Sequence, residues 1–321
     1  MNSDRPSPEN PAPAADHPAP ARHAHGHNDR PDPELYRTEP VSFVRRGDRL
    51  NPRRQRTWDR ARGTYLVDVP RDRATTSVAA GAEVDWAQVF GRTAPLVVDV
   101  GCGLGESTVQ GALDRPEADF LAVEVYTPGL AALLTEIEDR GLANVRGVQA
   151  NAPEVLDHLL APGSVQQVWV FFPDPWHKTR HHKRRLVSPA FADRVARVLV
   201  PGGVLRLATD WSSYAVHMRS VMEAHPEFAN LHPGRAAGAE SPLTRVRVEG
   251  RELQVGAQPI TPDAAGSRAG LSEASAAAGV EDPVDHDGGW APRFDGRPLT
   301  SFEAKALRAG RLVFDLAYRR L

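Results

Sequence analysis

The chain has 321 residues, which is long enough for one large domain or two small ones. Hydrophobic residues make up 41% and charged residues 25%, a balance that suits a packed core. The formal net charge of -2 argues against a protein whose whole surface coats nucleic acid or anionic membrane. A single cysteine, Cys102, excludes an internal disulfide and a cysteine-based zinc site. No signal-peptide core and no membrane-length apolar run stands out, so we expect a soluble, cytoplasmic protein without membrane contact.

Composition is uneven along the chain. Residues 1–35 contain eight of the 28 prolines and almost no large apolar side chain, which predicts a disordered tail. Residues 234–289 hold nine glycines, and nine acids against five arginines, which predicts an insertion or loop with at most a short strand near 245–249. The remainder suits one domain over 36–321, with a basic N-terminal extension over 36–90.

Between these segments, strand and helix patterns alternate. Strands are predicted over residues 96–100, 120–125, 145–149, 167–172 and 204–208. Helices are predicted over 106–113, 128–141, 153–160, 189–199 and from Ser212 or Ser213 to 222, with Ser188 as an N-cap. Residues 312–319 alternate between apolar and polar, which predicts an amphipathic final strand. The alternation indicates a doubly wound, mostly parallel α/β sheet, whose ligands bind at the carboxyl ends of the strands.

A glycine-rich turn follows the first predicted strand. Asp99 lies in that strand, and Gly101, Gly103 and Gly105 follow it. A dinucleotide fold would need its third glycine where Glu106 stands, and an acid there would repel a pyrophosphate. S-adenosylmethionine carries a sulfonium and an ammonium but no phosphate. The acids therefore favour S-adenosylmethionine over NAD, and a NAD-dependent oxidoreductase is the alternative.

The ends of the next two strands offer groups for an adenosine. Glu124 ends the second strand, where an acid can accept hydrogen bonds from both ribose hydroxyls. Asn151 follows the third strand, and its amide oxygen can accept from the adenine amino group. An equally good interpretation makes Asn151 the cap of a helix that begins near Pro153.

A rigid acidic turn follows the fourth strand. Asp174 stands between Pro173 and Pro175, which fix the backbone and remove competing N–H donors. Trp176, His177 and Lys178 come next, a run that a purely structural turn would not need. The turn therefore predicts a site beside the methyl donor.

Two basic segments predict contact with phosphates. The first runs from Arg37 to Arg62, contains nine arginines against three acids, and includes Arg45 and Arg46. The second has no acid and comprises Lys178, Arg180, Lys183, Arg184 and Arg185, with His181 and His182 among them. A charge run is usually a solvated surface, but the second segment follows a predicted ligand site, which favours nucleic acid. The two histidines lack a third ligand nearby, so no metal site is expected.

Two later segments bear on the substrate. Asp210 ends the fifth strand and can accept two hydrogen bonds from the ring N–H and exocyclic amine of a guanine, or it can simply begin the next helix. Thr300 and Glu303 have the spacing of a capping box, which explains them without any ligand.

Four of these motifs together resemble the bacterial tRNA (guanine-N7-)-methyltransferase family. They are Phe-Pro-Asp-Pro-Trp-His-Lys at 172–178, Ala-Thr-Asp-Trp at 208–211, Arg-Pro-Leu-Thr-Ser-Phe-Glu at 297–303 and Ser-Phe-Val-Arg-Arg at 42–46. The first is highly specific. The resemblance covers about residues 36–232 and 290–321, and Asn151 departs from it because the family commonly has aspartate there.

The resemblance implies a seven-stranded, Rossmann-like class I methyltransferase fold with an antiparallel final strand. It implies methyl transfer from S-adenosylmethionine to guanine N7 at position 46 of the tRNA variable loop, by a monomer or homodimer. By position, the donor site would comprise Asp99, Gly101, Gly103, Glu124, Asn151 and Asp174. The guanosine would contact Lys178, Asp210, Thr300, Ser301, Phe302 and Glu303.

The chemistry makes Asp174 the catalytic candidate. Guanine N7 carries a lone pair and no proton, so its methylation needs no general base. It needs positioning and a field that favours positive charge on the base, which a carboxylate supplies. A methyltransferase for another RNA base or a small molecule, and a non-catalytic RNA-binding protein, are the alternatives.

Overall fold

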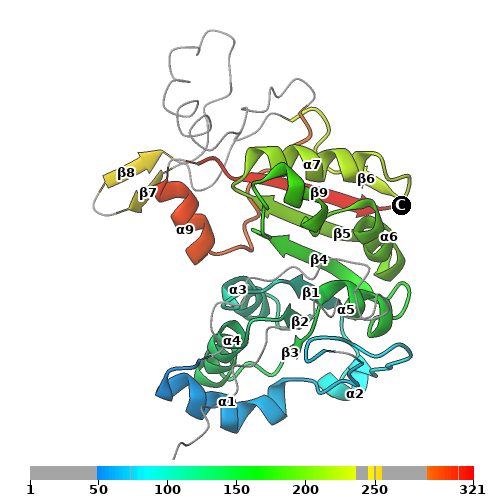
Figure 1. Ribbon diagram of the computed structural model, residues 1–321, viewed down its shortest axis with the longest axis vertical. Coiled ribbons are helices and arrows are strands. Elements are labelled where there is room, and N and C mark those ends of the chain that lie inside the picture. The colour runs from blue at the N-terminus through cyan, green and yellow to red at the C-terminus, as the bar shows by residue number, and fades with distance from the viewer. Residues whose placement is uncertain (1–48, 73, 236–244, 249–250, 255–287, 310) are drawn as a thin grey trace, which may run out of the picture. The chain divides into compact units, whose positions relative to one another are not determined.

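The computed structural model describes residues 49–72, 74–235, 245–248, 251–254, 288–309 and 311–321 (Figure 1). All of them belong to a unit that spans Glu39–Leu321. The predicted tail, Arg45, Arg46 and most of the predicted insertion lie outside the described residues. Within the described ranges, no helix has the length and apolar character needed to cross a membrane.

Strands and helices alternate through the unit as the sequence predicts. The strands are β1 (Leu96–Val100), β2 (Asp119–Glu124), β3 (Val145–Gln149), β4 (Val165–Phe171), β5 (Leu199–Thr209), β6 (Phe228–Asn230), β7 (Arg245–Val248), β8 (Arg251–Gln254) and β9 (Phe314–Arg320). The helices are α1 (Pro52–Tyr65), α2 (Trp86–Phe90), α3 (Glu106–Asp114), α4 (Thr127–Arg140), α5 (Ala152–His158), the 3-10 helix η2 (Thr179–Arg184), α6 (Pro189–Val198), α7 (Ser212–Glu223) and α9 (Ser301–Arg308).

Seven strands form one sheet in the order β3-β2-β1-β4-β5-β9-β6 (Figure 1). Strands β1 to β5 pair in parallel, and β9 pairs antiparallel with β5 on one side and β6 on the other. The order runs outward from β1 in both directions, so the helices that connect the strands must cover both faces. The predicted doubly wound sheet with an antiparallel final strand is confirmed.

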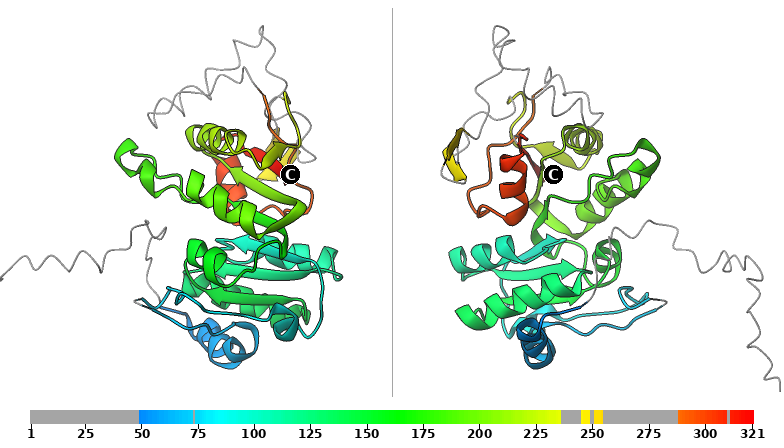
Figure 2. Two further views of the ribbon diagram at one scale, coloured as in Figure 1. Left: turned by 90° about the vertical axis from the view of Figure 1, so that its right-hand side faces the viewer. Right: turned by 60° about the vertical axis from the view of Figure 1, so that its left-hand side comes forward.

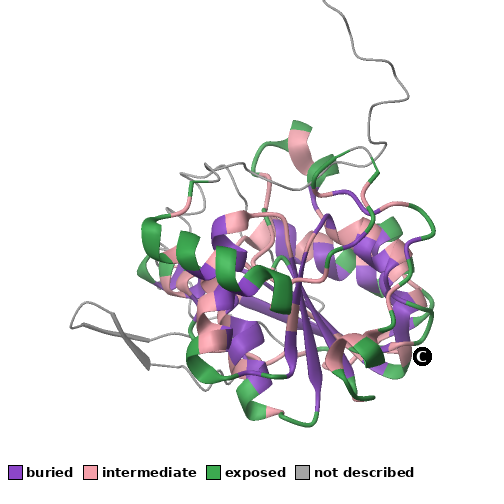
Figure 3. Ribbon diagram, turned by 90° about the horizontal axis from the view of Figure 1, so that it is seen from below, coloured by how far each residue is buried: buried purple, intermediate pink, exposed green. Residues whose placement is uncertain are grey.

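Helices cover the two faces of this sheet (Figures 2 and 3). A hydrophobic cluster fills the space between the sheet and the helices on each face. On one face, side chains of α1, α3 and α4 pack with alternate residues of the strands, among them Phe120 and Trp169. On the other face, α5, α6 and α7 pack against the intervening residues, such as Val98 and Val168. Burial on both faces explains why these strands read as continuous apolar runs in the sequence.

The last strand differs from its prediction. Residues Phe314 to Tyr318 of β9 are all buried, although the alternating pattern predicts one polar, exposed face. The reason is its place between β5 and β6, inside the sheet, where α7 packs on one face and the buried Arg297 covers Asp315 on the other. Asp315 is therefore a buried acid that requires a partner.

The predicted capping residue is confirmed for one helix and wrong for another. Ser188 caps α6 and accepts a hydrogen bond from the backbone N–H of Phe191, as predicted. The predicted serine cap of α7 is wrong, because Trp211 is the N-cap residue and makes no side-chain capping bond. The short strand predicted near 245–249 is confirmed as β7, and its partner β8 was not predicted.

Two glycines within helices test how closely the layers pack. A Cβ on Gly111 in α3 would lie 2.7 Å from both Phe120 Cε1 and Trp169 Cη2, whereas one on Gly63 in α1 would meet nothing within 4 Å. We expect Gly111→Ala to destabilise the protein by about 1–3 kcal/mol through overpacking. The matched variant Gly63→Ala should stabilise it by about 0.5–1 kcal/mol. Denaturant unfolding checks both, and equal effects would contradict the described packing.

Candidate functional site

The predicted donor residues lie on four adjacent strands of the sheet. Asn151 follows β3, Glu124 ends β2, Asp99 lies near the end of β1, and Asp174 follows β4. Asp210 follows β5, the next strand in the order. Because β1 to β5 are parallel, all five residues lie at the same edge of the sheet, the one toward which the arrowheads of these strands point in Figure 1. This is the edge where ligands of doubly wound sheets bind.

The glycine turn between β1 and α3 is closed by Glu124. The Glu124 carboxylate accepts hydrogen bonds from the backbone N–H groups of Gly103 at 2.9 Å, Val125 at 2.7 Å and Tyr126 at 3.0 Å. Gly103 itself has a φ of +59°, which favours glycine. The acid predicted to bind a ribose therefore also holds the turn in shape, and a carboxylate with about four acceptor positions retains capacity for a further donor.

Burial and mutual repulsion perturb the acids of this turn. Asp99 is 2% exposed, and burial raises its pKa to about 7, although the Thr108 hydroxyl donates to its Oδ2 at 2.6 Å and opposes the rise. Burial also raises the pKa of Glu124, with a further contribution from the negative charge of Asp174. None of the described lysines and arginines forms an ion pair with Asp99 or Glu124. The site thus favours a cationic ligand.

Asn151 is the N-cap residue of α5, although its side chain does not cap the helix. Its side chain makes no capping bond, and its Nδ2 lies 3.4 Å from Glu154 Oε1. Asn151 is thus the N-cap residue by position, as the alternative interpretation expects, but it lacks the side-chain hydrogen bond of a cap. Its backbone N–H donates to the Thr76 carbonyl at 2.7 Å, which fixes its position at the carboxyl end of β3.

The turn around Asp174 is held in an unusual backbone conformation. Phe172 and Trp176, which flank it, have φ of 53° and 48°, values that are costly for residues with a side chain. Arg185 is 6% exposed and donates to the Pro175 carbonyl at 2.9 Å. Asp174 itself is exposed. The surrounding contacts therefore hold this carboxylate at the surface, close enough to Glu124 to influence it.

The basic segment after this turn divides into two kinds of residue. Lys178, Arg180, Lys183 and Arg184 are exposed, as a phosphate-binding surface requires. Arg185 corrects the prediction for this segment: its guanidinium is buried against Tyr214 and bonds to Ser213 as well as to Pro175. Arg185 thus holds the acidic turn to α7 and does not belong to the exposed surface.

Asp210 has a partner that the sequence did not reveal. Arg311, just before β9, donates to Asp210 Oδ2 from Nε at 2.9 Å and approaches it with Nη2 at 2.7 Å. The two residues are 101 positions apart, so no local pattern could have paired them. A guanine that binds Asp210 would share this carboxylate with Arg311 or displace the arginine from it.

The Thr300–Glu303 turn begins α9, and Thr300 and Glu303 make contacts that stabilise the fold. The Thr300 hydroxyl accepts from the Glu303 N–H at 3.1 Å, which confirms half of the capping box. The Glu303 side chain does not complete the box. It is 1% exposed and pairs with Arg293 at 2.7 Å and Arg297 at 3.3 Å. Glu303 is therefore buried beneath the turn, whereas Phe302 beside it is 48% exposed.

Arg297 connects this turn to the sheet. It is 1% exposed and donates to both oxygens of Asp315 in β9, from Nη1 at 2.5 Å and Nη2 at 3.0 Å, as well as to Glu303. Burial alone would lower its pKa, but the two carboxylates outweigh burial and raise it. Its guanidinium also lies 5.1 Å from the Phe171 ring and 5.4 Å from the Phe172 ring. Arg297 thus contacts both predicted substrate-side turns.

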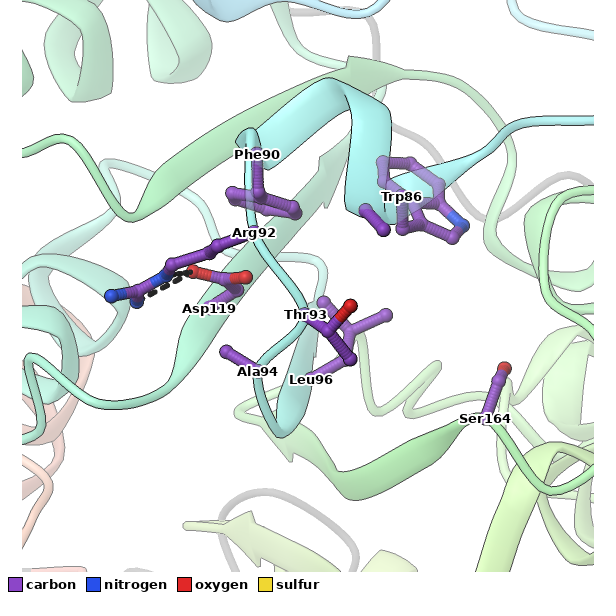
Figure 4. A pocket seen from close by; sticks show the side chains of 9 residues that line it. Trp86, Phe90, Arg92, Thr93, Ala94, Leu96, Asp119 and Ser164 are labelled. Atoms are coloured by element: carbon purple, nitrogen blue, oxygen red, sulfur yellow. Dashed lines mark hydrogen bonds and ion pairs between the residues drawn. The ribbon is translucent and has the colours of Figure 1, made fainter.

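A separate hollow lies at the opposite edge of the sheet (Figure 4). Trp86 and Phe90 of α2 line it together with Leu96 and Asp119, which begin β1 and β2. Arg92 closes one side through an ion pair with Asp119 at 2.7 Å. None of the predicted site residues lies there.

Comparison with known proteins shows which proteins this chain is similar to. A family described as "Putative methyltransferase" matches residues 93–255. The tRNA (guanine-N(7)-)-methyltransferase of Paenarthrobacter aurescens is 54% identical over 89% of this chain and 93% of its own length. That of Cutibacterium acnes is 39% identical over 88% of this chain and 83% of its own. The solved structure of the 16S rRNA methyltransferase KamB matches 73% of this chain and 92% of its own, with 18% identity and a TM-score of 0.39.

The family match and the doubly wound sheet define the chain as a methyltransferase. More narrowly, the sequence relatives show that it belongs to the tRNA (guanine-N(7)-)-methyltransferase family. The resemblance seen in the sequence motifs is confirmed.

The buried Arg297 network yields a stability prediction. We expect Arg297→Met to destabilise the protein by about 3–5 kcal/mol, because it leaves Asp315 buried without this guanidinium and leaves Glu303 with Arg293 alone. The control Arg140→Met, which breaks only the exposed pair with Glu136 on α4, should cost less than about 1 kcal/mol. Denaturant unfolding at neutral pH measures both, and similar losses in the two variants would contradict the role given to Arg297.

Proposed function

We propose that this chain transfers the methyl group of S-adenosylmethionine to guanine N7 of tRNA, at position 46 of the variable loop. The observation that carries the proposal is the contact between the turn that holds the donor acids and the turn predicted to hold the guanosine: Ser301 bonds to Glu106 and Phe302 lies near Gly103. Family membership supports the reaction, and the exposed cations of η2 support a polyanionic substrate.

The donor end fits S-adenosylmethionine. The buried Asp99 and the partly buried Glu124 form an acidic site without an ion-pair partner among the described residues, which suits the ammonium and the ribose of the donor. Asn151 offers an amide oxygen toward an adenine. Gly101 and Gly103 provide the turn without adding side chains. When bound, the donor supplies an electrophilic methyl group on its sulfonium.

The guanosine would be held from three sides. Asp210 can accept from the guanine edge, with Arg311 beside it to share the charge. Lys178 is exposed and offers a cation. Thr300, Ser301 and Phe302 form the rim of α9, with the Phe302 ring exposed for stacking. Glu303 supports this rim from below through Arg293 and Arg297.

Asp174 is the catalytic residue in this proposal. The reaction forms a bond between N7 and the methyl carbon and breaks the carbon–sulfur bond, so no proton has to be removed. Positive charge moves from sulfur onto the guanine. The Asp174 carboxylate, held on a rigid turn at the end of β4, can orient the reacting groups and stabilise that charge.

The composition-based boundaries are part of the same proposal. One methyltransferase domain would occupy residues 36–321, with 1–35 as a tail and 234–289 as an insertion. A cytoplasmic monomer or homodimer is consistent with a tRNA substrate.

Mass spectrometry of tRNA after incubation with isotopically labelled donor tests the function. We expect one labelled methyl group on the guanine at position 46. Asp174→Ala should reduce the rate at least about 100-fold, because it removes the charge proposed to stabilise the transition state, and the melting temperature should be kept because Asp174 is exposed. The matched control is Asp139→Ala, an exposed aspartate of α4 that should leave the rate unchanged. Near-normal turnover in Asp174→Ala, or label on another base, would contradict the proposal.

The raised pKa of Asp99 predicts a pH dependence of donor binding. The pKa is about 7, so the fraction of ionised Asp99 increases between pH 6 and 8 and attracts the donor ammonium more strongly. We expect the affinity for S-adenosylhomocysteine, measured by calorimetry, to increase about tenfold over this range. Asp99→Asn should bind more weakly and with a flatter profile. A wild-type affinity that does not change with pH would refute this role for Asp99.

A further inference from the structure

Glu106 joins two helix N-termini that the sequence separates widely. It is the first residue of α3, directly after the glycine turn. Its carboxylate accepts the backbone N–H of Ser301, the first residue of α9, at 3.1 Å to Oε1 and 3.0 Å to Oε2. It also accepts the Ser301 hydroxyl at 3.2 Å. The two residues are 195 positions apart.

The physical basis is the unsatisfied N–H groups of a helix start. The first N–H groups of α9 have no partner within the helix, and Glu106 satisfies one of them from outside. The positive ends of both helix dipoles meet at this one carboxylate, which makes a negative charge there favourable. Glu106 occupies the position where a dinucleotide-binding turn has its third glycine. The contact with Ser301 explains why a glutamate stands there instead.

The same two turns also come close to each other at a second point. The Phe302 ring of α9 lies 3.6 Å from the position that a Cβ on Gly103 would occupy. Gly103 in turn donates its N–H to Glu124, the acid predicted to bind the donor ribose. A change in the glycine turn on donor binding would therefore reach Ser301 and Phe302 directly.

We propose that Glu106 is a positioning residue that couples donor binding to guanosine binding. This inference rests on the proposed function, because it takes the glycine turn as the donor site and the start of α9 as part of the guanosine site. In this proposal Glu106 acts through Ser301 rather than by contact with either ligand. Donor and tRNA should then bind with positive cooperativity, each improving the affinity for the other by the same factor.

A thermodynamic cycle on the full chain tests the coupling. The affinity for S-adenosylhomocysteine is measured by calorimetry with and without unmodified tRNA, and the ratio is the coupling factor. We expect at least about fivefold for the wild type. Glu106→Ala and Glu106→Asp should reduce the factor below about twofold, since the first removes the carboxylate and the second shortens its reach. Their affinity for S-adenosylhomocysteine alone should stay within about twofold of the wild type.

The variants separate positioning from folding. Glu106→Asp keeps a negative charge at the start of α3, so it tests the contact even where Glu106→Ala fails to fold. Glu106→Gln keeps an acceptor for the Ser301 N–H and should retain more coupling than either. A wild type that methylates tRNA without coupling, or a Glu106→Asp variant with wild-type coupling, would overturn the inference. A wild type that methylates no guanine would instead contradict the proposed function.

Discussion

The buried pairing of Arg297 with Asp315 and Glu303 is the interaction on which the substrate side of this protein depends. The Arg297 guanidinium is only 1% exposed, so its charge must be paired with carboxylates. These are Asp315 in β9 and Glu303 at the start of α9. The pairing fixes α9 against the last strand of the sheet, and the rings of Phe171 and Phe172 fix it against the end of β4. The position of the Thr300–Phe302 rim follows from this geometry.

The donor side obeys a different constraint. Parallel strands bring Asp99, Glu124 and Asp174 to one edge of the sheet. Burial and the nearby negative charges make ionisation of Asp99 and Glu124 unfavourable there. A cationic ligand relieves that cost, which a phosphate could not do. Glu106 then stands between the two sides: it follows the donor turn in the chain and holds the first N–H of α9. Donor chemistry and substrate positioning thus meet within one short stretch.

Much of the fold could be predicted from the sequence because the patterns that define strands and helix caps are local. The strand β3 was predicted with its observed bounds, and the Ser188 cap of α6 was confirmed, since apolar runs and caps depend on near neighbours. The amphipathic interpretation of β9 was wrong because its burial depends on which strands lie beside it. The sequence placed Arg185 in an exposed basic surface, but its partners Pro175 and Ser213 bury it.

The sequence by itself determined the class of the protein. Its motifs identified the family, and the alternation of strands and helices placed the chemistry-bearing residues at the carboxyl ends of strands, because side-chain type and spacing are written in the chain. Only the tertiary structure decided which residues are paired. Three such pairs join segments that are separated in the chain and become neighbours only in the folded protein. They are Arg311 with Asp210, Arg297 with Asp315, and Glu106 with Ser301. These contacts depend on burial and distance in space, which no short sequence pattern encodes.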